Sequence, residues 1–190
     1  DLEYIINHAG DRVIFADEDL LPLLEPLWGK IPCVELLVIC RHGEGGESSF
    51  ANQIDYEDLI ADHPAAYDWP DIPETAPMGL CYTSGTTGNP KGVMYTNRST
   101  YLHTLTESLT DSMGLSALDS LLGIVPMFHA MGWGLPFAAS MLGTKQAYPH
   151  RFMTPDSFLS LMQQEQVTIS AGVPTILSLI HISEPTRPSV

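Results

Sequence analysis

One segment of the chain combines hydroxyl groups, glycines and a cation at a spacing suited to phosphate. Residues 83–92 read TSGTTGNPKG. Glycines let backbone N–H groups approach a phosphate closely, hydroxyls add hydrogen-bond donors, and Lys91 adds a point charge. The candidate nucleotide-binding residues of this loop are Thr83, Ser84, Gly85, Thr86, Thr87, Gly88 and Lys91.

The loop differs from the other common phosphate-binding motif, G-x-x-x-x-G-K-[ST]. Counted from Gly85, the second glycine position is Pro90, and the residue after Lys91 is Gly92 instead of Ser or Thr. The alternative interpretation is a polar turn without a ligand. Against it stand the strand predicted before the loop, the Gly-Thr-Thr-Gly run and the closing Pro-Lys-Gly.

A second motif, PMFHAMGWGLP at residues 126–136, places His129 four residues before Trp133. Taken alone, His129 is an ordinary loop histidine and Trp133 a core aromatic, because single residues of these types carry little information. Their occurrence downstream of the phosphate loop favours a functional role for both.

The hydrophobic pattern predicts an α/β fold. Strands are predicted at residues 12–16, 34–40, 79–83, 93–95, 121–125, 145–148 and 167–171. Helices are predicted at residues 2–9, 20–28, 56–61, 98–112, 135–142 and 155–164. Asn97 and Thr154 are predicted as helix N-caps, and loops are expected at 41–52 and 126–134. Alternation of strands and helices indicates a mixed, mostly parallel sheet flanked by helices. Residues 62–78, which hold four prolines, are expected to form an extended connector.

Composition excludes several classes of partner. The net charge is −15 with only 8 Lys and Arg, so we expect no binding to nucleic acid or to anionic lipid. No apolar stretch is long enough for a transmembrane segment. The three cysteines match no metal spacing and are expected to be reduced and buried, which favours a cytoplasmic location.

The end of the chain has an unusual sequence. Residues 177–188, LSLIHISEPTRP, match the translation of a transposon adaptor used in preparing sequencing libraries; its bases CTGTCTCTTATACACATC encode the first six. We expect residues 177–190 to be a non-native tail, and residues 1–176 to be native. A different base sequence at these codons would contradict this. The first residue is Asp1, so we also expect that the natural N-terminus is missing.

The loop and three further segments resemble the adenylate-forming superfamily, which includes acyl-CoA synthetases, luciferases and adenylation domains. The further segments are residues 95–105 (YTNRSTYLHTL), 126–136 and 167–175 (VTISAGVPT). Within the superfamily the chain most resembles medium- and long-chain fatty-acid–CoA ligases. The resemblance spans residues 1–176 and implies part of the large N-terminal AMP-binding domain.

The resemblance implies a two-step reaction using ATP, Mg²⁺ and coenzyme A. A fatty carboxylate attacks the α-phosphate of ATP to give acyl-adenylate and pyrophosphate, and the thiol of coenzyme A then displaces AMP. By the same resemblance Thr83 helps to hold Mg²⁺, Ala130 contacts the nucleotide, and Trp133 lines or gates the acyl tunnel. Lys91 and His129 are the catalytic assignments. His129 is given a positioning role, because a carboxylate is already ionised at neutral pH.

Several alternatives stay open on the sequence alone. The acid could be an aryl or amino acid, or the reaction could stop at acyl-AMP without coenzyme A. Non-catalytic nucleotide binding and ordinary phosphoryl transfer are alternatives from other classes. Superfamily elements that lie further along the chain, including a Glu that completes the Mg²⁺ site and a catalytic Lys, are not in this sequence. We therefore expect the isolated chain to be inactive, and its full-length parent to be an acid–thiol ligase and a homodimer.

Overall fold

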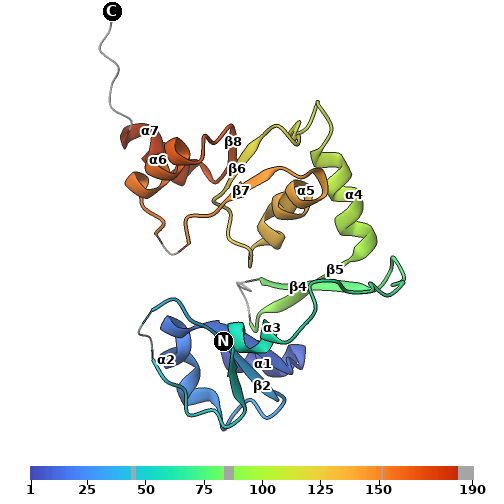
Figure 1. The fold of residues 1–190 in the computed structure, drawn as a ribbon, viewed down its shortest axis with the longest axis vertical. Helices are drawn as coiled ribbons and strands as arrows, with labels where there is room; N and C mark the ends of the chain where they lie inside the picture. Colours follow the sequence, from blue (N-terminus) through green and yellow to red (C-terminus); the bar gives the residue numbers. More distant parts are fainter. Residues whose placement is uncertain (44–45, 84–87, 151, 184–190) are drawn as a thin grey trace, which may run out of the picture. The chain divides into compact units, whose positions relative to one another are not determined.

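The computed structural model describes residues 1–43, 46–83, 88–150 and 152–183 (Figure 1). The chain divides into two compact units. The first unit contains residues 1–71 and 83–92, and the second contains residues 72–82 and 93–190. The predicted α/β class is confirmed, with the strands distributed over three sheets.

The first unit is built on a parallel three-stranded sheet in the order β1-β2-β3. Its strands are β1 (Val13–Asp17), β2 (Leu36–Cys40) and β3 (Gln53–Asp55), and its α-helices include α1 (Leu2–Ala9) and α3 (Tyr56–Ala61). The central strand β2 is nearly continuous in hydrophobic residues, as expected for a strand paired on both edges. Leu37 and Ile39 on β2 pack with Leu21 and Leu24 in the core of this unit.

The prediction of one continuous helix at residues 20–28 is wrong. The structure has three short pieces, η1 (Glu18–Leu20), α2 (Leu21–Leu24) and η2 (Glu25–Leu27). Pro22 and Pro26 each lie in the first two positions of a short helix. Proline lacks the backbone N–H that would continue an α-helix, so the segment restarts at each proline.

A connector without helix or strand covers residues 62–76 and leads into a two-stranded sheet. The sheet pairs β4 (Pro77–Thr83) with β5 (Lys91–Thr96), and the helix α4 (Asn97–Glu107) follows directly. The connector is tied to the start of α4, since the Arg98 N–H donates to the Glu74 carbonyl at 2.7 Å. The two side chains also form an ion pair.

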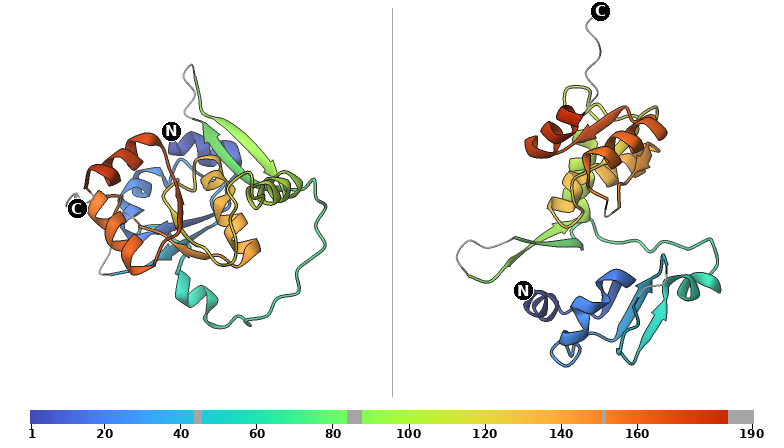
Figure 2. Two further views of the ribbon diagram at one scale, coloured as in Figure 1. Left: turned by 90° about the horizontal axis from the view of Figure 1, so that it is seen from above. Right: turned by 90° about the vertical axis from the view of Figure 1, so that its left-hand side faces the viewer.

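The second unit contains a parallel sheet in the order β7-β6-β8 (Figure 2). Its strands are β6 (Ser120–Gly123), β7 (Lys145–Ala147) and β8 (Ile169–Ala171), and its further helices are α5 (Leu135–Leu142), α6 (Pro155–Gln164) and α7 (Pro174–Ser183). Successive residues of a strand face opposite sides. Leu121 accordingly packs against α5, whereas Leu122 packs with Phe158 of α6 and Ile180 of α7.

The predicted helix bounds agree with the structure at α1, α3, α5 and α6. Thr154 is confirmed as the N-cap of α6, because its side chain accepts from the Ser157 N–H. The prediction for α4 is wrong at both ends. Its N-cap is Thr96 instead of Asn97, and the helix ends at Glu107, five residues early. The strand β3 was not predicted.

Candidate functional site

The predicted phosphate loop is carried by the paired strands β4 and β5. Thr83 is the last residue of β4 and Lys91 the first residue of β5. The Thr83 hydroxyl donates to the Lys91 carbonyl at 3.5 Å, and both residues are exposed. Gly88 has φ +129°, a conformation open to glycine but rarely to other residues. The predicted residues Ser84, Gly85, Thr86 and Thr87 lie outside the described part of the chain.

The chemistry of Thr83 fits one ligand of a magnesium ion. Its exposed hydroxyl is a hard oxygen donor at the end of a strand. Mg²⁺ prefers oxygen ligands and usually takes most of them from water and from the phosphates of its substrate. One protein hydroxyl at a phosphate loop is therefore a compatible contribution.

The helix that follows the loop strands is fixed at its first turn. The Thr96 side chain accepts from the Ser99 N–H, and the Ser99 side chain accepts from the Thr96 N–H, which together form a capping box. This arrangement satisfies two backbone donors and sets where α4 begins.

Residues 130–134, within the second predicted motif, form a left-handed turn. The element η3 (Ala130–Gly134) has positive φ at all five positions, from +46° at Ala130 to +80° at Gly134. Three of the five, Ala130, Met131 and Trp133, are not glycine. Left-handed backbone costs a residue with a Cβ about 1–2 kcal/mol. The surroundings must hold this turn in place, and such strain is concentrated at functional sites.

Side chains from β4 and α4 hold this turn. Met131 Sδ lies 3.3 Å from Cys81 Sγ, and its methyl group occupies the space that a side chain on Gly79 would need. His103 Nε2 lies 2.9 Å from the carbonyl oxygen of Trp133 and 3.4 Å from Glu107 Oε1. Contacts at two points of the turn thus restrain its conformation.

Glu107 is a buried carboxyl at the end of α4. It is 6% exposed, and its Oε2 has no hydrogen-bond partner among the described residues. Burial raises the pKa of this carboxyl above its ordinary value, and the neighbouring His103 opposes the shift. The pair His103–Glu107 is therefore the electrostatically unusual feature next to the left-handed turn.

The turn forms one wall of a cavity of about 400 Å³ inside the second unit. The lining is mostly apolar and aromatic, with a few polar groups, as is common for small-molecule sites. The cavity is lined by Tyr95, Ser99, Thr100, His103, Ala130, Met131, Trp133, Gly134 and Phe137. A neighbouring groove of about 750 Å³ shares Thr100 and Phe137 with it and extends along α4 to Met78 and Met141.

The structure brings together some of the predicted residues. Ala130 and Trp133 both line the cavity, and Thr83 contacts Lys91 separately. His129 is not among the described residues that line the cavity; its side chain is exposed, and its carbonyl accepts from the Gly132 N–H at 3.0 Å. The sequence shows His129 at the start of the turn but does not show where its ring lies.

Sequence reasoning did not single out His103 and Glu107. Their spacing of four residues on a helix is visible in the sequence and predicts that the two side chains are neighbours. The contact that gives them a role, between His103 and the Trp133 carbonyl, joins residues thirty positions apart. No local pattern indicates such a contact.

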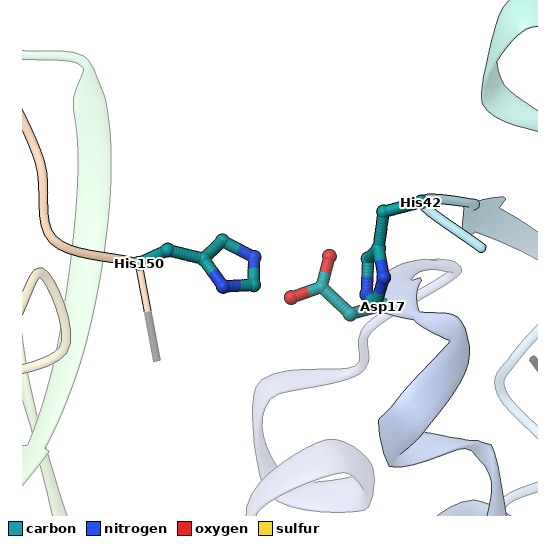
Figure 3. Close-up of side chains that lie close together, drawn as sticks. All are labelled: Asp17, His42 and His150. Atoms are coloured by element: carbon teal, nitrogen blue, oxygen red, sulfur yellow. The ribbon is translucent and has the colours of Figure 1, made fainter. Parts of the chain in front are cut away.

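A second group of polar residues lies at the carboxyl ends of β1 and β2 in the first unit. Figure 3 labels two of them, Asp17 and His42, and His42 Nδ1 lies 3.3 Å from the buried Glu18 Oε1. The His42 N–H also donates to Glu18 at 3.1 Å, and Arg41 lies 3.7 Å from the same carboxyl group. A guanidinium so close to Glu18 disfavours a cation, so this group holds the turn after β2. His150, also drawn in Figure 3, belongs to the second unit.

Comparison with known proteins identifies the family. The AMP-binding enzyme family matches residues 1–189. A medium-chain-fatty-acid–CoA ligase of Ectopseudomonas oleovorans is 43% identical over 176 residues, which are 92% of this chain and 32% of that protein. A long-chain-fatty-acid–CoA ligase of Thermus thermophilus is 40% identical over 187 residues, covering 98% of this chain and 33% of that protein.

Solved structures agree with this match. A long-chain-fatty-acid–CoA ligase of Archaeoglobus fulgidus superimposes with a TM-score of 0.76 at 25% identity, over 94% of this chain and 33% of that one. An anthranilate–CoA ligase in complex with anthranoyl-AMP gives a TM-score of 0.77 at 23% identity, over 94% of this chain and 34% of that one, and shows the shared fold. No described helix has the length and apolar character needed to span a membrane. The chain spans about a third of the length of these relatives, and it belongs to the AMP-binding enzyme family.

Proposed function

We propose that this chain is part of a ligase that activates a fatty acid with ATP and transfers the acyl group to coenzyme A. The observation that carries the proposal is the match of residues 1–189 to AMP-binding enzymes, together with the mostly apolar cavity that is lined by Ala130 and Trp133. The 43% and 40% identical relatives are ligases of medium-chain and long-chain fatty acids.

The first step joins the acid to the nucleotide. A carboxylate oxygen attacks the α-phosphorus of ATP, the bond to the bridging oxygen breaks, and pyrophosphate leaves with the bonding electrons. Negative charge accumulates on the leaving group, so donors aimed at it lower the barrier. Lys91 supplies a positive charge for this purpose, and residues 83–88 supply hydroxyl and backbone donors. Mg²⁺, with Thr83 as one of its ligands, would neutralise charge on the phosphates when bound.

The second step releases the acyl group to a thiol. The sulfur of coenzyme A attacks the acyl carbon, the bond from that carbon to the AMP oxygen breaks, and AMP leaves. The thiol proton passes to solvent or to a base. In this proposal Ala130 contacts the nucleotide through its backbone, Trp133 lines the path of the acyl chain, and His129 positions the reacting groups.

The chemical class of the acid is the part of the proposal that most needs a test. The anthranilate ligase shares the fold, so the fold alone does not select an alkyl chain over an aryl acid. The mostly apolar lining of the cavity supports an alkyl chain. We also propose that the enzyme is cytoplasmic and that it is a homodimer. Light scattering of the protein at its full encoded length would test whether it is a dimer.

Acid-dependent ATP–pyrophosphate exchange tests the function. The protein in its full encoded length is assayed with butyrate, octanoate, palmitate, anthranilate and an amino acid. We expect exchange with octanoate or palmitate at least tenfold above anthranilate. Exchange that prefers anthranilate or the amino acid would move the protein to another substrate class. Exchange with none of the five acids would refute adenylation of carboxylates.

Two substitutions connect the activity to the loop. Lys91→Gln and Thr83→Ala should each lower the exchange rate about 10- to 100-fold, the effect of losing one hydrogen bond to a charged group. Lys30→Gln is the matched control, because Lys30 is an exposed lysine of the first unit whose ion partner, Glu3, lies 3.9 Å away. Equal rates for Lys91→Gln and Lys30→Gln would contradict the role of the loop.

We further propose that residues 177–190 are a translated adaptor and are foreign to the enzyme. The run LSLIHISEPTRP supports this. Re-reading the DNA at these codons tests it, and bases unrelated to the adaptor would overturn it.

A further inference from the structure

The left-handed turn at residues 130–134 must be held against its own strain. Three residues with side chains, Ala130, Met131 and Trp133, have φ of +46°, +55° and +59°. At about 1–2 kcal/mol for each, left-handed backbone here costs several kcal/mol. The turn keeps this conformation only if contacts outside it compensate. Removal of a single contact should therefore change how often the turn is formed.

His103 makes a direct contact with this turn. Its Nε2 lies 2.9 Å from the Trp133 carbonyl oxygen. A carbonyl oxygen only accepts hydrogen bonds, so Nε2 must carry the hydrogen whatever the charge of the ring. The bond joins the middle of α4 to the fourth residue of the turn, and both His103 and Trp133 line the 400 Å³ cavity.

Glu107 lies beside the His103 ring. It lies one helical turn after His103, and its Oε1 is 3.4 Å from the same Nε2. Because Glu107 is buried and its Oε2 has no hydrogen-bond partner among the described residues, the structure tolerates an uncompensated polar atom at this place. Such atoms are rare in folded proteins and call for an explanation.

Gly134 leaves space for this arrangement. Its φ is +80°, and a Cβ at this position would overlap His103 Cδ2 and lie 2.8 Å from His103 Nε2 and 3.1 Å from Glu107 Oε2. Any larger residue here would displace the ring. The close approach of the backbone, the imidazole and the carboxyl group is thus built into the fold of the second unit.

We propose that His103 is a positioning residue, which holds the Trp133 carbonyl and thereby fixes the turn that forms the wall of the substrate cavity, with Glu107 orienting its ring. The inference rests on the proposed function in that it assigns the cavity to the acyl substrate. It adds that the shape of the cavity depends on a side chain of α4, outside the motif at residues 126–136.

The rival explanation is that His103 only helps α4 to pack. In that case its loss would lower the stability of the second unit without moving Trp133. The two explanations differ in the folded state, so the test must observe Trp133 under native conditions. Trp133 is well suited to this, because the other two tryptophans, Trp28 and Trp69, lie in the first unit.

The spectroscopic experiment uses the 190-residue chain with Trp28→Phe and Trp69→Phe, so that Trp133 is the sole tryptophan. We expect His103→Leu to shift the emission maximum of Trp133 and to lower its anisotropy. His103→Gln, which keeps an N–H donor near the position of Nε2, should restore most of the original signal. Thr106→Leu adds the same leucine to an exposed position of α4 and should leave the emission unchanged.

The kinetic experiment uses the protein in its full encoded length. His103→Leu should raise KM for the fatty acid about three- to tenfold, the range expected for losing one hydrogen bond. Since a less populated turn reduces apparent affinity by its population, kcat should stay within about twofold. His103→Gln should return KM toward the original value, and Thr106→Leu should not change it.

The results separate the two proposals. If the unsubstituted enzyme adenylates no acid, the proposed function fails, while the emission of Trp133 still tests the positioning role. The positioning role is overturned if His103→Leu leaves the Trp133 emission and KM unchanged and lowers only the denaturation midpoint. It is equally overturned if His103→Gln is as damaging as His103→Leu.

Discussion

Substituting Gly134 by alanine tests the close packing behind the left-handed turn. The new methyl group makes the backbone conformation with φ +80° unfavourable, and it also overlaps the imidazole of His103. The first effect costs about 1–2 kcal/mol. The second moves His103 away from the Trp133 carbonyl. This costs a further amount of about 0.5–1.5 kcal/mol, because one hydrogen bond is lost. The sum is a loss of roughly 1.5–3.5 kcal/mol in the free energy of unfolding.

A second glycine separates these two effects. Gly143, the C-cap of α5, has φ +74°, and a Cβ there would meet nothing within 4 Å. Gly143→Ala therefore loses stability only through its left-handed backbone conformation. The difference between the two variants isolates the displacement of His103, and we expect it to be about 0.5–1.5 kcal/mol.

The assay is urea denaturation followed by the emission of Trp133, in the chain whose Trp28 and Trp69 are replaced by Phe. This signal reports on the second unit, which contains both glycines. Equal free energies of unfolding for Gly134→Ala and Gly143→Ala, within about 0.3 kcal/mol, would refute the reasoning. It would mean that the ring of His103 is not held where the structure has it.

Three further predictions concern charge and packing. Burial raises the pKa of Glu107 above its ordinary value of 4.5, so its stabilising effect is complete below pH 4.5 and is lost as the pH rises through the folded-state pKa. Glu107→Gln should flatten this fall in the free energy of unfolding, and a free energy with the same pH dependence as in the unsubstituted chain would contradict the prediction. Hydrogen bonds, chiefly from the Ser49 side chain, lower the pKa of Glu25 to about 2, so its contribution to the stability of the fold is present above pH 4.5 and is lost as the pH falls toward 2. An NMR titration of this carboxyl group with a midpoint near pH 4.5 would disprove the prediction. Leu122 is completely buried, and Leu122→Ala should cost about 2–5 kcal/mol in urea denaturation, whereas a loss below about 1 kcal/mol would show that the site is loosely packed.

Much of the fold could be predicted because its signals are local. Thr154 followed by Pro155 marks the start of α6, and the apolar run of β2 marks a strand that is paired on both edges. The bounds of α5 follow from Gly134 before it and Gly143 after it. In each case the residues that decide the structure lie within or beside the element.

The errors arise where a decision depends on competition or on distant contacts. Both Thr96 and Asn97 are good N-cap residues, and Thr96 is the cap because Ser99 completes its capping box. Pro22 and Pro26 each interrupt the helix that the apolar pattern of residues 20–28 predicts. β3 has only three residues and exists through its pairing with β2.

Two residues that line the cavity could be predicted from the sequence, but the geometry of the cavity could not. The sequence indicated Ala130 and Trp133, and both line the cavity. It did not indicate the left-handed turn, because a run of positive φ at residues with side chains is unfavourable locally and depends on outside contacts. For the same reason His103, which supplies one of these contacts, could be found only from the structure.

The most direct test of the central claim follows an oxygen atom. A fatty acid labelled with ¹⁸O in its carboxylate is incubated with ATP, coenzyme A and the protein in its full encoded length. If the carboxylate attacks the α-phosphate, one labelled oxygen remains on the nucleotide, and we expect ¹⁸O-containing AMP in amounts equal to acyl-CoA. Label in inorganic phosphate, with ADP as the nucleotide product, would show attack at the terminal phosphate and would contradict adenylation.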